Sequence, residues 1–464
     1  MKKSLIYLLA AIFTVSILFM GIGCKGAVEE AVEEVIEAVE EVEEATEEVE
    51  EAAEEEAPAE EIILRFTDWQ GGNDGILATY NDLIEIFEAE HPGVTVEYQQ
   101  YTVTTYNEFL KPAISGGTAP DLFAVYPGPD VAEVVEAGAL RDLVGDIDDE
   151  WKGWLGPAYN FKGMWQGDGI YIVAQDVWTE CIWYHKDMLE EIGWEPVEST
   201  ESFSVEDYIA MVEPATAAGY ELMSAGFIEA WSYFDPYYNF VHQQEENEKP
   251  DIVQQAMDGE VSWQQDIFRN AFDVFVKLND AGVWKQDALS MDYQVQAFGD
   301  WMERKSIFMW GQGDWFAGSM KEEENTRENP NIGIVQWPLV NTSAEVAFSK
   351  NFGTDIGVYA KGEYQDLAIE WIRLTSSPQA AEIFISYGCN PASGVDVSNL
   401  PEIESPILEE CVKLYNSPGK YSEVYYFNAD AVKALGDGIG NILLGVDTVD
   451  NVLAQLDDIC GYEG

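Results

Sequence analysis

Aromatic side chains stand beside acids and amides at several places in this chain, and these groups are the residues best suited to ligand chemistry. The sequence has 15 Trp, 23 Tyr and 21 Phe. A sugar ring offers an apolar C–H face that an aromatic ring can cover, and hydroxyls that carboxylates and amides can bind. The clearest groups are the peptides DWQ (68–70), WSYFD (231–235) and QGDW (312–315). This pattern favours a sugar as the ligand.

Catalytic and metal-binding signatures are missing from the sequence. It contains no GxSxG, GxxxxGK[ST], HExxH or GxGxxG motif. The three His are far apart and no two Cys form a CxxC pair, so no zinc spacing is present. A pair of glycosidase carboxylates stays open as an alternative, because the many acids single out no pair. We expect no catalytic residue, no cofactor and no metal.

One acidic run raises the question of calcium. It contains Asp142, Asp146, Asp148, Asp149 and Glu150. The run lacks the glycine and the ligand spacing of an EF-hand loop. A solvated acidic loop is therefore the favoured interpretation.

The charge of the chain excludes several classes of partner. Only 23 Lys and Arg stand against 87 Asp and Glu, for a formal net charge of -64. Such a chain repels phosphate backbones and anionic lipid, so we expect no nucleic-acid partner. The 464 residues, 47% of them hydrophobic, are enough for two or three domains or one large two-lobed body.

Strands and helices alternate at the start of the globular part. Apolar runs predict strands at 62–67, 94–98 and 121–126, and the intervening patterns predict helices over about 76–90, 105–115 and 129–137. This order implies an α/β fold with parallel pairing. Ligands bind beyond the carboxyl ends of such strands, which places Asp68, Trp69 and Tyr126 at a candidate cleft.

The N-terminus has the pattern of an export signal. Lys2 and Lys3 precede an apolar run that is short for a transmembrane helix, and small residues lead to Cys24. The pattern resembles the lipobox of bacterial lipoproteins, with Gly21 where that family prefers Leu, Val or Ile. The resemblance implies a signal peptide at 1–23 and lipidation of Cys24. An uncleaved anchor with an ordinary Cys is the alternative.

Residues 24–61 form a Glu-rich acidic linker. Val and Ala recur at heptad spacing, which is compatible with a coiled coil, but nearly every flanking position is Glu with no Lys to pair. A solvated spacer is favoured. Beyond Cys24, four Cys remain at 181, 389, 411 and 460, either as disulfides or as buried free thiols. Cys389 and Cys411 are the favoured pair if a disulfide exists.

Seven short motifs, in order, resemble the extracellular solute-binding proteins of family 1, which deliver sugars to ABC importers. The motifs are FEAEHPGVTV (87–96), GTAPDL (117–122), AGALRDL (137–143), YHKDM (184–188), GQGDW (311–315), AIEWI (368–372) and TSSPQ (375–379). The family usually has Tyr-Asn-Lys-Asp-Leu in the fourth motif, where this chain has His185. The chain also has Val173-Ala174 where the family has Val-Pro.

The resemblance implies a two-lobed periplasmic-binding-protein fold, type II-like, with hinge crossovers and a ligand cleft between the lobes. Crossovers would fall near 174–178, 348–354 and 418–424. Lobe one would then comprise 62–175 plus 352–420, and lobe two 176–351 plus 421–464.

The resemblance also implies site residues. Trp315 follows the glycine turn that carries a stacking aromatic, and Trp231 and Tyr233 lie in a segment that supplies a second platform. The complete set of expected ligand-binding residues is Asp68, Trp69, Tyr126, Trp178, Trp231, Tyr233, Asp314, Trp315, Tyr425 and Tyr426. Asp68 and Asp314 are the acids expected to bind hydroxyls, and Asp176 lies with Trp178 at the first crossover.

The resulting hypothesis is a lipid-anchored, extracytoplasmic substrate-binding protein of an ABC importer. It would be a monomer that binds a mono- or oligosaccharide, works with permease subunits and is not an enzyme. One alternative is a binding protein for a polyol, a glycerol phosphate or a peptide, although the scarcity of Lys and Arg disfavours a phosphate ligand. The other alternative is a secreted carbohydrate-active enzyme.

Overall fold

The computed structural model describes residues 62–228, 231–244, 252–319, 331–340, 348–392, 406–416, 419–421 and 429–464. The predicted export signal, Cys24, the acidic linker and the site candidates Tyr425 and Tyr426 lie outside these residues. The chain divides into two compact units, Met1–Ile62 and Ile63–Gly464. The description below concerns the second unit.

The first sheet has five strands in the order β2-β1-β3-β12-β6. Their bounds are Ile62–Asp68 (β1), Val94–Gln100 (β2), Leu122–Ala124 (β3), Val173–Ala174 (β6) and Asp355–Val358 (β12). β1 and β3 pair in parallel, as the alternating pattern predicts. β12 runs antiparallel to both β3 and β6. The strand and helix order of this region confirms the predicted α/β class.

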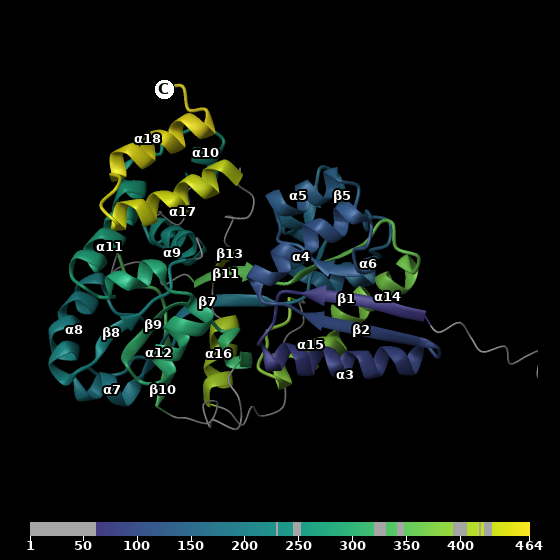
Figure 1. Cartoon of the computed structure of the whole chain (residues 1–464), viewed down its shortest axis with the longest axis horizontal. Coiled ribbons are helices and arrows are strands. Elements are labelled where there is room, and N and C mark those ends of the chain that lie inside the picture. Colours follow the sequence, from purple (N-terminus) through teal and green to yellow (C-terminus); the bar gives the residue numbers. More distant parts are fainter. Residues whose placement is uncertain are drawn as a thin grey trace, which may run out of the picture. The chain divides into compact units, whose positions relative to one another are not determined.

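Helices cover the first sheet and their ends follow from the sequence. They are α3 (Asp74–Glu90), α4 (Val103–Gly116), α5 (Pro129–Glu136), α6 (Asp149–Leu155), α14 (Gln365–Thr375) and α15 (Pro378–Ser386). The Asn73 side chain accepts from the Ile76 N–H and so caps α3. Gly117, in the left-handed conformation, ends α4. Figure 1 shows α3 and α15 together beside β1 and β2.

The second sheet is built around β7 (Val177–His185). The strand order is β13-β11-β7-β9-β8, with β10 also paired to β7. β7 runs antiparallel to β9, β10 and β11. The other strands are β8 (Glu221–Ser224), β9 (Ser306–Gly313), β10 (Ile332–Val335), β11 (Phe348–Phe352) and β13 (Gly419–Tyr421), and a separate hairpin joins β4 (Trp165–Gln166) to β5 (Gly169–Ile170).

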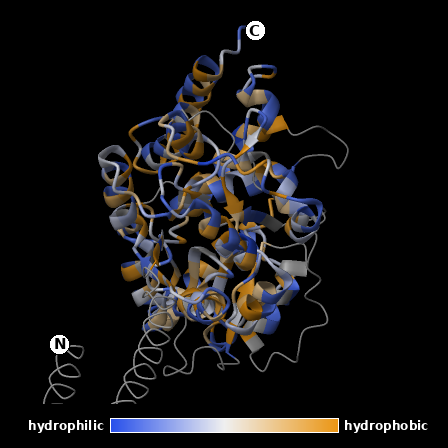
Figure 2. Cartoon of the chain, turned by 90° about the vertical axis from the view of Figure 1, so that its right-hand side faces the viewer, coloured by the Kyte–Doolittle hydropathy of each residue, from blue (hydrophilic) through white to orange (hydrophobic). Residues whose placement is uncertain are grey.

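Two apolar clusters form on opposite faces of β7, because side chains alternate along a strand. Ile182 and Tyr184 belong to a large cluster, and Cys181 and Trp183 to a smaller one. The helices of this half are α7 (Lys186–Glu191), α8 (Val205–Ala218), α9 (Trp231–His242), α10 (Ile252–Met257), α11 (Asp266–Asp280), α12 (Phe298–Met302), α13 (Phe316–Ser319), α16 (Pro406–Asn416), α17 (Ala429–Leu443) and α18 (Val449–Cys460). Figure 2 shows hydrophobic and hydrophilic residues interleaved along the helices, as amphipathic packing requires.

Two strand pairs connect the sheets. The chain passes from β6 to β7 through residues 175–176, and from β11 to β12 through residues 353–354. Both links lie at or beside the predicted crossovers at 174–178 and 348–354. α16 contributes Ile407, Cys411 and Leu414 to the smaller cluster on β7, and β13 pairs with β11. Residues 390–392 pair with 175–177 beside these links, ahead of the predicted third crossover at 418–424, and the limits of the lobes stay a prediction.

The four described cysteines are free thiols. Cys181, Cys389 and Cys411 are buried and Cys460 is partly buried. Among the residues that the structure describes, no helix is long and apolar enough to cross a membrane.

Candidate functional site

An aromatic stack stands at the carboxyl ends of β1 and β3. The Trp69 and Tyr126 rings are nearly parallel, with centroids 4.0 Å apart and an interplanar angle of 12°. Tyr106 packs edge-on against Trp69 at 5.5 Å. Trp69 is only 4% exposed, and its buried indole N–H has no hydrogen-bond partner within the part of the chain that the structure describes. The sequence predicted that Trp69 and Tyr126 share this edge, and the structure places them there.

Asp68 lies just before this stack and is fully buried. Its Oδ2 accepts from the Tyr98 hydroxyl at 2.7 Å and its Oδ1 from the Gln70 N–H at 2.9 Å. Burial raises the pKa of Asp68 to about 7, although both hydrogen bonds oppose the shift. Asp68 is therefore committed to local hydrogen bonds, and it orients the segment that presents Trp69.

A second aromatic pair joins the first crossover to the end of β9. Trp178 and Trp315 are both half-buried, with ring centroids 5.2 Å apart in an edge-to-face arrangement. Gly313 makes the approach of Trp315 possible, because a Cβ at that position would lie 1.9 Å from the Trp315 ring. Trp315, predicted from the glycine turn, is therefore in contact with Trp178, predicted from the first crossover.

Asp314, beside Trp315, ties several segments together. Its Oδ1 accepts from the Thr179 N–H at 2.9 Å, and its Oδ2 accepts from Asn390 Nδ2 at 2.6 Å. Burial raises the pKa of Asp314 to about 8, and the positive charge of Lys350 opposes that shift. These contacts hold β7, β9 and residue 390 in fixed relation.

Other predicted residues lie away from these pairs. Tyr233 is 5% exposed and stacks on Phe227 at 4.8 Å, inside the large apolar cluster. Trp231 begins α9, and the described residues do not include its side chain. Tyr425 and Tyr426 are outside the described residues.

A buried pair of acids was missed by the sequence analysis as a site feature. Glu180 on β7 and Asp235 on α9 are each 2% exposed, and each has one carboxyl oxygen without a hydrogen-bond partner among the described residues. The other Glu180 oxygen accepts from Asn351 Nδ2 at 2.9 Å. Burial raises the pKa of both acids, and the nearby Asp235 raises that of Glu180 further. An acid inside the apolar run of β7 is the signal that could have identified it.

The charge of Asp235 also acts on the first aromatic stack, through the Tyr126 hydroxyl. Burial raises the pKa of Tyr126, and the charges of Asp130 and Asp235 add to the shift. α9, which packs on the second sheet, therefore carries its acid near the end of β3.

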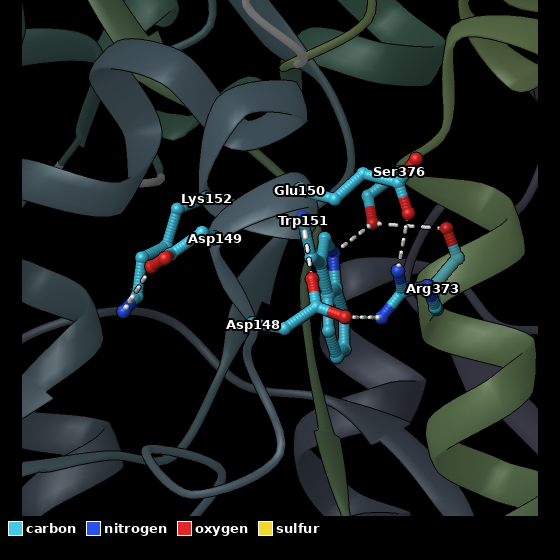
Figure 3. Close-up of polar contacts among 7 residues, drawn as sticks. All are labelled: Asp148, Asp149, Glu150, Trp151, Lys152, Arg373 and Ser376. Atoms are coloured by element: carbon cyan, nitrogen blue, oxygen red, sulfur yellow. Dashed lines mark hydrogen bonds and ion pairs between the residues drawn. The ribbon is translucent and has the colours of Figure 1, made fainter.

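The acidic run at 142–150 forms ion pairs with arginine. Asp148 caps α6, and Arg373 binds Asp148 at 2.8 Å and Glu150 at 2.9 Å (Figure 3). The Arg373 guanidinium lies 5.7 Å from the Trp151 ring, whose indole N–H donates to Ser376. Within the described residues, no group of three or more metal-ligating side chains could hold a metal ion. These ion pairs connect α6 to α14.

Comparison with known proteins assigns the fold. The family model of the bacterial extracellular solute-binding proteins matches residues 70–382. A putative binding protein of Brucella abortus is 27% identical over 116 residues, which are 25% of this chain and 27% of the relative. The chain thus aligns with about a quarter of the length of the curated relatives it matches.

Solved structures match over nearly their full length. One comes from a study of xylan utilization by Caldanaerobius polysaccharolyticus, with a TM-score of 0.73, 17% identity and coverage of 86% of this chain and 99% of the other. Another is the GacH receptor of Streptomyces glaucescens, studied unliganded and with acarbose, with a TM-score of 0.68, 19% identity and coverage of 85% and 96%. At these identities the likeness shows the two-lobed fold alone.

Proposed function

The chain belongs to the bacterial extracellular solute-binding proteins, and on this premise we propose that it captures a mono- or oligosaccharide for the permease of an ABC importer. Proteins of this family act outside the cytoplasm, bind solutes and work with ABC transporter permeases. Their role is binding, and the proposal assigns no catalytic step to this chain.

The observation that carries the sugar assignment is the pair of aromatic contacts at the strand ends. Trp69 is only 4% exposed and backs the half-buried Tyr126 ring, so Tyr126, Trp178 and Trp315 supply the flat apolar surfaces of the size of a pyranose ring. Two structural neighbours, one from a study of xylan utilization and one studied with acarbose, support the same ligand class.

The two acids of the predicted site have supporting roles in this proposal. Asp68 and Asp314 are buried and already accept hydrogen bonds from the protein. Asp68 orients Trp69, and Asp314 orients Trp315. The ligand-binding roles of Trp231, Tyr233, Tyr425 and Tyr426 stay predictions of the sequence, and the core position of Tyr233 argues against its contact with ligand.

A thermal-shift screen tests the assignment. Xylo-, malto- and chito-oligosaccharides and single hexoses are added to the purified protein, because a ligand that binds only the folded state raises the melting temperature. At least one sugar should raise it, and incubation with that sugar should leave it chemically unchanged. A shift with peptides or glycerol phosphate and none with any sugar would overturn the assignment.

We further propose that the protein is a monomer held to the membrane by a lipid on Cys24. The export signal followed by Cys24 supports the anchor. Cys24→Ser should release the protein from membranes or leave it unprocessed, as fractionation and N-terminal mass spectrometry would show. Retention of a normally processed variant would contradict lipidation at this position.

A further inference from the structure

The links between the two sheets are short and are paired with each other. β6 pairs antiparallel with β12 in the first sheet, and β7 with β11 in the second. Between them, the Gln175 N–H donates to the Thr354 carbonyl at 2.9 Å and the Gly353 N–H to the Asp176 carbonyl at 3.0 Å. Two antiparallel strands therefore pass from one sheet to the other as a continuous ribbon.

Side chains add a second layer of contacts to this ribbon. Asp176 Oδ1 accepts from the Thr354 N–H, and its Oδ2 lies 3.4 Å from the Thr354 hydroxyl. Gln70 Nε2 donates to Asp176 Oδ2 at 3.0 Å and to Thr354 Oγ1 at 2.6 Å. All three side chains are at least nine-tenths buried. One amide group thus binds both strands of the ribbon.

Gln70 comes from outside the ribbon. It follows Trp69 directly, and its N–H donates to Asp68 Oδ1. A single three-residue segment therefore holds Asp68, the stacking Trp69 and the amide that binds the ribbon. A shift of Trp69 on ligand binding moves the atoms that fix Asp176 and Thr354.

We propose that Gln70 is a positioning residue that couples the ligand-stacking segment at the end of β1 to the pivot between the lobes. The ligand side of this coupling rests on the proposed function, but the effect of Gln70 on the pivot can be tested without a ligand. The amide is suited to this role because it donates two hydrogen bonds and carries no charge beside two buried acids.

The test measures the distance between the lobes in the ligand-free protein. Spin labels are placed at Glu85→Cys on α3 and Ala210→Cys on α8, both exposed, in a Cys460→Ser background. Gln70→Met keeps the length of the side chain but removes both donated hydrogen bonds. The inter-label distance distribution should broaden and its mean should shift.

Two further variants separate positioning from a general loss of structure. Gln254→Met, on α10, removes an amide donor to Asp258 and should give the same distance distribution as the parent protein. Gln70→Glu should lie between the parent and Gln70→Met at pH 4.5, where a protonated carboxyl donates one of the two hydrogen bonds, and match Gln70→Met at pH 8, where the carboxylate donates none. The parent is measured at both pH values, because Asp68, Asp176, Asp355, Tyr80 and Tyr98 also lie near this position.

An unchanged distribution in Gln70→Met, with a folded protein by circular dichroism, would overturn the proposal. So would a Gln70→Glu distribution that is the same at both pH values. Neither result depends on a sugar, so the proposed function can stand if the coupling fails. If instead no sugar binds while the distributions change as expected, the pivot stands and the proposed function fails.

Discussion

Buried acids are a prominent feature of the residues that the structure describes. Asp68, Asp314, Glu180 and Asp235 are each at most 2% exposed. A charged carboxylate is costly to bury, so these groups favour the protonated form in the folded state. Asp68 and Asp314 lie at strand ends, where they hold the turns that carry Trp69 and Trp315, whereas Glu180 lies within β7 and Asp235 on α9.

The buried acid pair leads to a pH prediction. Asp235 has its pKa raised by burial to about 7, well above its ordinary value, and that of Glu180 is raised as well. Between about pH 4 and pH 7 the unfolded chain has lost protons that the folded chain keeps. The unfolded state then binds fewer protons, so the free energy of unfolding falls as pH rises.

Glu180→Gln should reduce this fall, because the amide does not titrate and its oxygen can still accept from Asn351. The melting temperatures of wild type and variant are compared at pH 5 and pH 8. Relative to the wild type, the melting temperature of the variant should be higher at pH 8 than at pH 5. Parallel curves would show that the pair keeps the same protonation on unfolding.

Trp315 should contribute to sugar binding more than to stability. It is half-buried and its ring is covered on one side by Trp178. Trp315→Ala should weaken binding of the sugar found in the screen by about 1–3 kcal/mol, the scale of an aromatic contact. Its effect on the ligand-free melting temperature should be small.

Calorimetry and a thermal melt of the same samples check this expectation. Trp154→Ala is the matched control, since Trp154 is also half-buried but is covered by Arg373, 5.0 Å from its ring. The control should keep full affinity. Unchanged affinity in Trp315→Ala, together with a large loss of stability, would assign Trp315 to the core.

At the scale of single residues, the sequence predicted neighbours better than it predicted burial. Asp68 and Trp69 share a turn, and Asp314 and Trp315 share another, so each pair is local and readable from the chain. Tyr233 has the same kind of neighbours, yet it stacks on Phe227 in the core. Which aromatic side chains face a ligand depends on the face of α9 that packs on the sheet, and the segment WSYFD does not reveal that face.

Among the structural elements, the strands that connect the sheets are the most constrained. A Cβ at Gly353 would lie 2.4 Å from Asp176 Oδ1 and 2.8 Å from the Trp178 ring. Both neighbours are fixed by other contacts, so the ribbon has no room for a methyl group. Gly353 is needed for this close approach rather than for its backbone angles.

Gly353→Ala should therefore destabilise the protein by about 1–3 kcal/mol, the usual cost of an overpacked site. Gly116→Ala is the control, because its Cβ would meet only Thr118 Oγ1 at an ordinary 3.7 Å. Denaturant unfolding of both variants measures the difference. Equal stability of the two variants would contradict the tight packing of the ribbon.

The elements near the N-terminal end of the globular part were predictable and the later ones were not. Strands and helices up to α5 follow from apolar periodicity and from cap residues such as Asn73 and Gly117. β12 is only four residues long, and it is antiparallel to β3 although the alternating pattern implies parallel pairing. Its pairing is decided by a contact between residues more than 200 positions apart, which local patterns do not contain.

On the scale of the whole molecule, the two-lobed fold predicts closure around a ligand. We expect the pivot to lie in the two strand links and the adjoining segment at 390–392, where bending would move one sheet against the other. Small-angle scattering should give a smaller radius of gyration with a saturating sugar than without it. A tightly bound sugar that leaves the scattering profile unchanged would contradict closure.

The central claim is that a sugar binds against the two aromatic contacts at the strand ends. A crystal structure of the complex with the tightest sugar from the screen tests this most directly. The predicted result is a sugar ring packed face-on against Trp315, Trp178 or Tyr126. A sugar bound with none of these aromatic side chains in contact would contradict the claim.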